Sequence, residues 1–341
     1  IPFHRYQDEI MTPVAEHLVE AAYCCRNQDH TSFVHFTIAP EYENRFKQHV
    51  ESLTPLLEDK LNTRFHLSFS FQDENTDTLA VDLNNNPFRT RDGKLLFRPG
   101  GHGSLLQNLN RMEQDMIFIK NIDNVSSDPK RKESIRYHKK VLAGFLIAME
   151  KEIHEQIQQL KANPGDLHEH LRFIRETLQI KLPESIYHQS REEQIGFCLE
   201  KLNRPVRVCG MVKNEKQTGG GPFWVVQNDG TITLQIVESA QVNRDNPAQK
   251  DIFNRATHFN PVDIVCSIKN YRGEVFDLSQ YINPKTGFIS PKSIEGNPVK
   301  ALEHPGLWNG SMAYWNTLFV EVPTETFNPV KEIFDLQQSQ H

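Results

Sequence analysis

Apolar and polar positions along the first 130 residues follow a pattern typical of a sheet covered by helices. Residues 12–22 and 40–61 show helical periodicity, whereas residues 31–38 and 65–71 alternate as strands do. A glycine-rich turn at 97–103 leads into a helical stretch at 104–109, and a short β-like run at 115–122 ends at Asp123. This alternation predicts an α/β domain, in which ligands bind at the carboxyl ends of strands.

The pattern changes after residue 130. Residues 131–202 show long helical periodicity, broken at Asn163-Pro164-Gly165 and at Leu182-Pro183. Strands resume at Val206, and Asn228-Asp229-Gly230 between apolar runs predicts a hairpin. We therefore divide the chain into a first part of the core (1–130), a helical insertion (131–203) and a β-rich second part (204–341).

Composition narrows the class of protein. The chain is 38% hydrophobic and 24% charged, with a net charge of -6 and no block of like charge, which argues against a nucleic-acid surface. No apolar run approaches the roughly 20 residues that span a bilayer, and no signal peptide is evident. Five cysteines without a Cys-x-x-Cys pair favour a reducing compartment, so we expect a cytoplasmic protein without membrane partners.

Two segments carry candidate chemistry. In Arg98-Pro99-Gly100-Gly101-His102-Gly103-Ser104, glycines permit close backbone approach to a flat ligand, although a tight strand-to-helix turn uses the same residues. In residues 118–124, Asp123 follows the carboxyl end of an apolar strand. A metal-binding carboxylate is expected at that position, but an aspartate there is also common as a simple turn residue.

Together these segments resemble the UDP-sugar pyrophosphorylase family, in which a Pro-Gly-His-Gly loop precedes a strand ending in Asn-x-Asp-Asn. Gly100 and Ser104 depart from the family pattern. Residues 131–202 and 302–310 have no counterpart in it, which points to an uncharacterised bacterial branch, a family of unknown function. The resemblance implies that Gly101, His102 and Gly103 lie against uracil and that Asp123 helps to hold Mg²⁺. We add Gln72, which follows the strand at 65–71, to the nucleotide-binding set.

Three further segments match the same family in order. They are 213–221, with a lysine and a glycine run, 234–242, similar to Leu-Glu-x-Ala-Gln-Val, and 252–260, similar to Phe-Asn-Thr-Asn-Asn. The resemblance places Gly220 and Glu238 near the sugar, with Asn260 as its hydrogen-bond partner. Asn309, in Trp308-Asn309-Gly310, is a further candidate for the sugar site, because an aromatic ring can stack on a sugar.

The most specific motif lies at 327–336. Phe-Asn-Pro-Val-Lys-Glu-Ile-Phe-Asp-Leu resembles the Phe-x-Pro-Val-Lys-x-x-x-Asp-Leu signature of the family, which implies that Lys331 reaches the phosphates. Family members begin with a Gly-x-Gly-x-Arg loop and a Pro-Lys-x-Leu-x-Pro segment, and Ile1-Pro2-Phe3 resembles the end of that segment. We therefore expect the loop to lie upstream of this chain, and the chain alone to be a poor catalyst.

The resemblance implies an α/β nucleotide-diphospho-sugar transferase fold (GT-A-like), with a mixed, mostly parallel central sheet. It implies a sugar-1-phosphate nucleotidyltransferase that converts UTP and a sugar 1-phosphate into a UDP-sugar and pyrophosphate with Mg²⁺. A non-catalytic nucleotide-sugar-binding or regulatory protein of the same fold is the alternative. A glycosyltransferase is a further alternative, but the Asp-x-Asp motif usual in that class is missing from the sequence.

Overall fold

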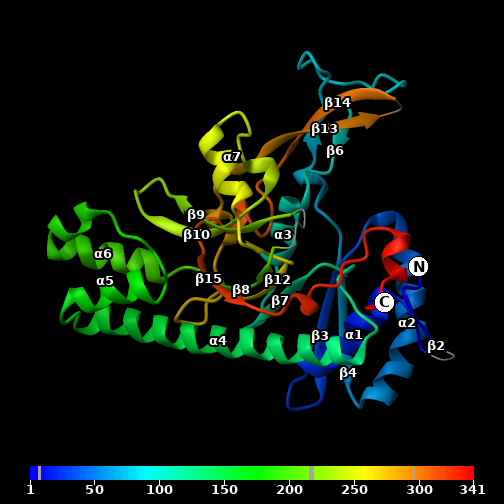
Figure 1. The fold of residues 1–341 in the computed structure, drawn as a ribbon, viewed down its shortest axis with the longest axis horizontal. Helices are drawn as coiled ribbons and strands as arrows, with labels where there is room; N and C mark the ends of the chain where they lie inside the picture. Colours follow the sequence, from blue (N-terminus) through cyan, green and yellow to red (C-terminus); the bar gives the residue numbers. More distant parts are fainter. Residues whose placement is uncertain (7–8, 215–218, 295) are drawn as a thin grey trace.

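The computed structural model describes residues 1–6, 9–214, 219–294 and 296–341. Its centre is a mixed sheet in the order β11-β8-β12-β7, with β15 parallel to β8 (Figure 1). Because β12 lies antiparallel between β7 and β8, strands β7, β8 and β15 all end at one edge, which we call the strand-end edge. The strands are β7 (Ile117–Lys120), β8 (Val206–Lys213), β11 (His258–Phe259), β12 (Asp263–Ser267) and β15 (Asn316–Glu321).

The first 70 residues form a helical layer with a separate parallel strand pair. β3 and β4 pair with each other from Thr31 to Thr37, apart from the central sheet. The first helix begins after Thr12, whose side-chain oxygen accepts a hydrogen bond from the backbone N–H of Ala15. A proline stands in its first turn. The elements are β1 (His4–Tyr6), β2 (Glu9–Met11), α1 (Pro13–Cys24), β3 (Thr31–Thr37), α2 (Glu43–Leu61) and β4 (Arg64–Ser70).

The longest element among the described residues, α4 (Pro129–Ala162), runs beneath the central sheet and reaches α1 (Figure 1). Its apolar stripe packs against β8 and β12 and supplies part of the largest core, including Leu142, Leu146 and Ile153. The helix ends before Asn163-Pro164-Gly165, as the sequence predicted, and α5 (Leu167–Glu176) and α6 (Arg191–Leu202) fold back beside it. Among the described residues, no helix is long and apolar enough to cross a membrane.

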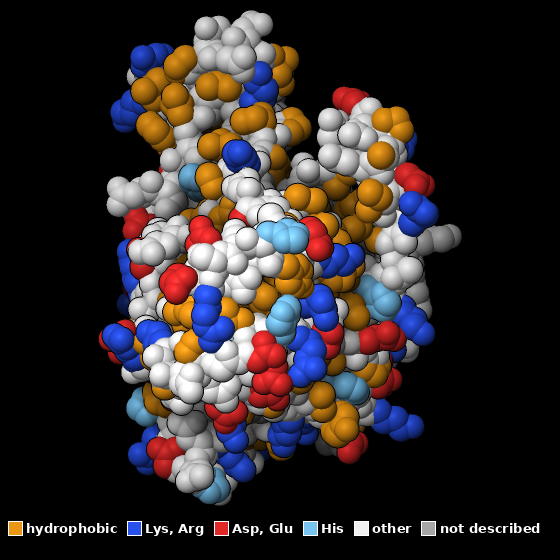
Figure 2. Space-filling view, turned by 90° about the vertical axis from the view of Figure 1, so that its left-hand side faces the viewer, with side chains coloured by type: hydrophobic (Ala, Val, Ile, Leu, Met, Phe, Trp, Pro, Cys, Tyr) orange, Lys and Arg blue, Asp and Glu red, His pale blue; other side chains and the backbone are white. Residues whose placement is uncertain are grey.

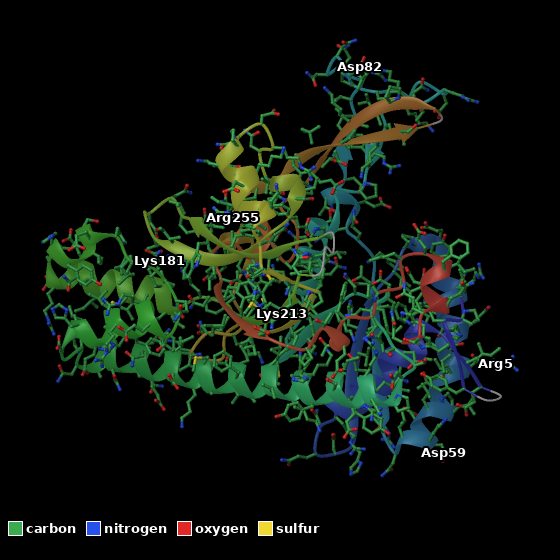
Figure 3. All side chains as sticks on the ribbon, in the orientation of Figure 1. Arg5, Asp59, Asp82, Lys181, Lys213 and Arg255 are labelled. Atoms are coloured by element: carbon green, nitrogen blue, oxygen red, sulfur yellow. The ribbon has the colours of Figure 1, made fainter. Side chains whose placement is uncertain are left out.

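Above the sheet lie a hairpin, a short helix and a projecting arm (Figure 1). The hairpin turns at Gly230, which has φ 82°, as the Asn-Asp-Gly sequence predicted. We define the arm as residues 78–98, 288–294 and 296–303; Asp82, labelled in Figure 3, lies at its outer end. The elements are β5 (Thr78–Leu79), β6 (Phe97–Arg98), α3 (Leu106–Leu109), β9 (Gly221–Val226), β10 (Ile232–Val237), α7 (Pro247–Asn254), β13 (Phe288–Ile294) and β14 (Asn297–Glu303).

The structure confirms a mixed α/β fold, but the expectation of a mostly parallel central sheet is wrong. Of the pairings in that sheet, only β15 with β8 is parallel. The reason is the connection from β8 to β12, which carries a hairpin and a short helix and returns the chain in the opposite direction. A single hydrophobic run does not reveal its direction, so this reversal was not visible in the strand pattern.

Candidate functional site

Asp123 and Lys331 meet at the strand-end edge, just beyond β7. The Lys331 ammonium lies 2.5 Å from Asp123 Oδ2, although the two residues are 208 positions apart. The turn that carries Asp123 is joined to the C-terminal segment by backbone: the amide of Val330 donates to the Asp123 carbonyl at 3.0 Å. The amide of Asn328 donates to Asn124 Oδ1 at 2.7 Å, and the Lys331 amide donates to Asp335. The Asn-Asp-Asn and Pro-Val-Lys motifs therefore form one structural unit.

Asp123 keeps one oxygen available. Its Oδ2 pairs with Lys331, whereas Oδ1 is buried and has no hydrogen-bond partner among the described residues. The side chain is 22% exposed and that of Lys331 is 62% exposed, so the pair lies at the surface. A carboxylate with a free oxygen at this edge suits a hard cation, which prefers oxygen ligands.

A buried network of ion pairs lies next to the turn that carries Asp123. Lys120, the last residue of β7, pairs with Glu20 of α1 at 2.7 Å, and Lys139 of α4 pairs with Asp263 of β12 at 2.6 Å and with Glu20 at 3.5 Å. Burial alone would raise the pKa of Glu20, but the two ammonium groups outweigh it and lower that pKa to about 2. Asp263 and Glu20 correspondingly raise the pKa of Lys139, against the effect of its burial.

His17 joins this network to the Asp123 turn. Its Nε2 lies 3.1 Å from the carbonyl of Ile122, the residue before Asp123. Burial, together with the nearby Lys120 ammonium, lowers the pKa of His17 to about 4. The imidazole is therefore neutral at pH 7, and its Nε2–H donates to the carbonyl. This network could not be predicted from the sequence, because its members are isolated titratable residues on four separate elements.

A second group of side chains surrounds His102. The His102 ring stacks on Trp308 with centroids 4.0 Å apart, and its Nδ1 accepts the Leu307 amide at 3.0 Å. Its Nε2 therefore carries the proton and lies 3.5 Å from Glu238, which also accepts the Trp308 indole N–H at 2.9 Å. Burial alone would raise the pKa of Glu238, but the bonds from His102 and Trp308 outweigh it and lower the pKa. We call His102, Glu238, Trp308, Asn309 and Gln241 the His102 cluster.

Asn309 also belongs to this cluster. Its side-chain Nδ2 donates a hydrogen bond to Gln241 Oε1 at 3.1 Å, while its side-chain Oδ1 is buried without a hydrogen-bond partner in the described part of the chain. Two residues assigned to the sugar, Glu238 and Asn309, thus lie together with one assigned to the base, His102.

The glycines of the 100–103 loop face the protein's own chain. A Cβ on Gly103 would lie 2.2 Å from the carbonyl oxygen of Pro305, and one on Gly101 would lie 2.8 Å from the Glu303 carboxylate. Gly101 also has φ 76°, a conformation that side chains rarely adopt. The loop therefore needs glycine to admit the 303–306 segment, and a ligand would have to approach from another side.

Gly220 and Asn260 connect the His102 cluster to the strand-end edge. A Cβ on Gly220 would lie 3.2 Å from Glu238 Cγ, and the Gly220 carbonyl accepts the Asn260 amide at 2.8 Å. The Asn260 side chain is buried and, among the residues described, bonds to backbone alone: it donates to the Gly210 carbonyl and accepts from the Val262 amide. Asn260 thus positions the Gly220 segment. Residues 215–218 of the matching segment lie outside the described residues.

A chain of contacts continues from there toward Lys331. The ring of Phe259 lies within 2.3 Å of the position of a Gly219 Cβ and packs against Phe327, whose ring centroid is 5.1 Å away. Phe327 begins the motif that ends at Lys331. A line of contacts, which we call the band, therefore runs from Glu238 through the 219–220 segment, Phe259 and Phe327 toward Lys331. No hydrogen bond or ion pair in the described ranges joins Asp123 directly to the His102 cluster.

Gln72 lies at the margin of this band. Its side-chain Nε2 donates a hydrogen bond to Asp77 Oδ1 at 3.3 Å, so its partner is only five residues away in sequence. The neighbouring carbonyl of Phe71 accepts from Asn108, in the helix that follows the glycine loop, and the carbonyl of Thr76 lies 2.8 Å from His304 Nε2. The segment around Gln72 thus borders the loop, while its side chain makes no hydrogen bond to the His102 cluster in the part of the chain described.

Arg207 of β8 is a buried cation that the sequence did not single out. It is fully buried and donates to Thr317 Oγ1, to Gln235 Oε1 and to the Trp308 carbonyl, at 2.9, 2.8 and 2.5 Å. Within the described ranges it pairs with no acidic side chain, and burial lowers its pKa. Arg207 therefore fixes the backbone of Trp308 beneath the His102 cluster. A lone arginine in a strand pattern carries no sequence signal for such a role.

Fold and site together define a mixed α/β protein in which the Asp123–Lys331 pair lies at the strand ends and a line of contacts leads from it to the His102 cluster. The chain belongs to the family described as domain of unknown function DUF4301, which matches residues 1–341. No curated protein matches the chain.

Solved structures similar to the chain include UDP-sugar pyrophosphorylases. A mutant UDP-glucose pyrophosphorylase from Leishmania major in complex with UDP-glucose is 13% identical, covering 95% of this chain and 57% of its own, with a TM-score of 0.45. A protein from Entamoeba histolytica described as a UDP-N-acetylglucosamine pyrophosphorylase is 11% identical, covering 99% and 72%, with a TM-score of 0.47. The chain thus spans little more than half of the Leishmania enzyme.

Proposed function

We propose that this protein is a sugar-1-phosphate nucleotidyltransferase that joins UTP and a sugar 1-phosphate to give a UDP-sugar and pyrophosphate. The contact between Asp123 and Lys331 carries the proposal. These residues come from the two motifs that resemble a metal-binding and a phosphate-binding segment, and they lie together at the strand-end edge. Ligands of α/β sheets bind at such edges.

In this reaction an oxygen of the sugar phosphate attacks the α-phosphorus of UTP. The new P–O bond forms as the bond to the β-phosphate bridging oxygen breaks, and the electron pair leaves with pyrophosphate. No protein nucleophile is required, so the protein contributes positioning and charge stabilisation. The Lys331 ammonium is suited to stabilise negative charge on the phosphate oxygens.

Asp123 is the residue that would hold Mg²⁺. Protein-bound Mg²⁺ commonly uses one or two carboxylates together with substrate phosphates and water. The unpartnered Oδ1 of Asp123 fits that demand for one protein ligand. Mg²⁺, when bound, would supply a positive centre for the phosphate oxygens.

The ion pair between Asp123 and Lys331 does not block this role. Lys331 is 62% exposed, and exposed ion pairs contribute about 1 kcal/mol or less. A triphosphate entering the site would therefore displace the ammonium from the carboxylate at little cost, and would itself attract the ammonium.

The band from His102 to Asn260 is the region that would take the base and the sugar. Glu238 is held as a carboxylate by His102 and Trp308, and Asn309 has an unpartnered oxygen, so both offer acceptors for hydroxyl groups. The His102 ring already has one face against Trp308, so uracil would contact its other face or the loop backbone.

Substitution at the strand-end edge tests the proposal. Asp123→Asn should lower Mg²⁺-dependent pyrophosphate release from UTP with a panel of sugar 1-phosphates on the order of 10²–10³-fold, because the amide has no charge to hold a cation. Lys331→Ala should lower kcat more than it raises the KM for the sugar phosphate. Thermal shifts with UTP and Mg²⁺ report binding independently of turnover.

The chain offers a matched control pair on the other side of β7. Asp115 pairs with Lys269 at 2.5 Å, so Asp115→Asn and Lys269→Ala remove the same groups away from the strand-end edge. These variants should keep normal activity and nucleotide binding. These assays use the full-length protein. Nucleotide binding without pyrophosphate release by the unsubstituted full-length protein would favour a nucleotide-sugar-binding protein instead, and unchanged turnover in Asp123→Asn would make Asp123 a turn residue.

A further inference from the structure

The arm carries a row of apolar side chains across its strands. Ile289 of β13 lies directly opposite Leu302 of β14, and Leu79 of β5 lies opposite Phe97 of β6. Val81 bridges antiparallel to Lys300, and in that register Leu79 faces Leu302. Directly paired residues project from the same face of a sheet, so the four side chains form one row.

The two faces of the arm differ sharply in exposure. Ile289, Phe97 and Leu302 are 59%, 54% and 42% exposed. Val299, three residues before Leu302, and Ala80, next to Leu79, lie on the opposite face and are fully buried. Figure 2 shows hydrophobic side chains gathered on the arm where it stands above the body. We call the face of Ile289, Leu302, Leu79 and Phe97 the open face.

The charges next to the open face are directed away from it. Lys300, in the next row, donates to the Leu83 carbonyl and to Asn85 Oδ1 in the turn at the outer end. Arg89, opposite Leu95, donates to the Gly93 carbonyl in the neighbouring turn. Both cations lie toward the outer end of the arm. Two arms packed in opposite directions would therefore keep these cations apart.

The free edge of the arm is protected against strand addition. β13 is the outer strand, and it contains Pro291, which has no amide hydrogen, and Lys292. Proline and lysine on an edge strand discourage pairing with another strand. Association through this arm is therefore expected face to face, as in a sandwich of two sheets.

The area of the open face suits a second copy of the chain. Three side chains of the open face, Phe97, Ile289 and Leu302, are 42–59% exposed. Two more lie next to them on the arm and are counted with them: Leu95, two residues before Phe97, is 40% exposed, and Leu83, whose carbonyl accepts from Lys300, is 60% exposed. At roughly 200 Å² for a fully exposed large side chain they present on the order of 500 Å², within the size of functional surface patches. Two such faces would bury about 1,000 Å² in total, the lower limit for a specific interface.

We propose that the open face is a homodimer interface, in which two copies pack their arms face to face about a twofold axis. This inference does not depend on the proposed catalytic function. It predicts a reversible dimer rather than an obligate one, because the buried area lies at the lower limit. Each side chain of the open face enters such an interface twice.

Sedimentation velocity and light scattering over a wide range of protein concentration test the proposal. The unsubstituted protein should dimerise with concentration. Ile289→Glu and Phe97→Glu should each raise the dimer dissociation constant by about tenfold or more, because each places two buried charges in the interface. Ile289→Thr, which retains a β-branched side chain, should shift it in the same direction by less.

Leu56→Glu is the control, because Leu56 is 71% exposed on α2, outside the arm, and should not change the dissociation constant. Circular dichroism of the monomeric fraction verifies the fold of each variant. A protein that stays monomeric at every concentration would overturn the proposal. A dimer that resists all three arm substitutions would overturn it too, because another surface would then hold the dimer.

Discussion

Lys139 is the residue whose loss the fold should tolerate least. Its ammonium is 2% exposed and lies 2.6 Å from Asp263 and 3.5 Å from Glu20. In Lys139→Met the apolar stem is retained and the charge is removed, so Asp263, 5% exposed, loses its ionic partner. Removing one member of a buried pair typically costs about 3–5 kcal/mol, because the remaining charge stays desolvated. Glu20 keeps its pair with Lys120 at 2.7 Å, so the loss falls mainly on Asp263.

Urea unfolding at pH 7 measures this free energy, and the melting temperature should fall by roughly 5–10 °C in parallel. The double variant Lys139→Met/Asp263→Leu should recover most of the loss, because it removes the unpaired charge as well. Lys47→Met is the control, since Lys47 pairs with Glu43 on the surface of α2 and should cost at most about 0.5 kcal/mol. A loss below about 1 kcal/mol in Lys139→Met, or no recovery in the double variant, would refute this account of the network.

Two further predictions concern His17 and the glycine loop. The pKa of His17 is lowered to about 4, so below pH 6.5 the unfolded chain binds a proton that the folded chain excludes, and stability should fall as pH drops from 6.5 toward 4. His17→Gln, which keeps a donor, should lessen that slope in urea titrations, and an identical slope would contradict the assignment. Gly103→Ala should destabilise by about 1–3 kcal/mol, because its Cβ would lie 2.2 Å from the Pro305 oxygen. Gly144→Ala, with open space at its Cβ, should be neutral or stabilising in the same unfolding assay.

Local elements were largely predictable from the sequence because their signals are local. The helix at 12–22 appears as α1 (Pro13–Cys24), the strand at 31–38 as β3 (Thr31–Thr37), and the helical stretch after residue 130 as α4, α5 and α6. Caps, prolines and apolar periodicity act within a few residues, so they can be read without the tertiary structure.

Strand direction and the buried charges were not predictable in the same way. The reversal of β12 between β7 and β8 depends on pairings about 55 and 145 residues apart in sequence, which no local pattern encodes. Lys139 and Arg207 look like ordinary polar positions of a helix and a strand, and only the packed fold shows that both are buried.

The candidate site shows the same division. The motifs at 118–124 and 327–336 correctly indicated two segments that meet, although their chemical roles stay predictions. Trp308 lay in a segment without a motif match, and yet it stacks on His102 and bonds to Glu238. Its partners lie 70 or more positions away, so its place in the cluster could be seen only in three dimensions.

The interlocking of the glycine loop with the 303–310 segment has a consequence for how the protein can evolve. A side chain at Gly103 would strike Pro305, and one at Gly306 would strike His102 and Asn309. Neither segment can therefore accept a larger residue unless the other yields space. Across related sequences the two segments should change together or not at all, so that a new ligand preference would arise by replacing the pair as one inherited block.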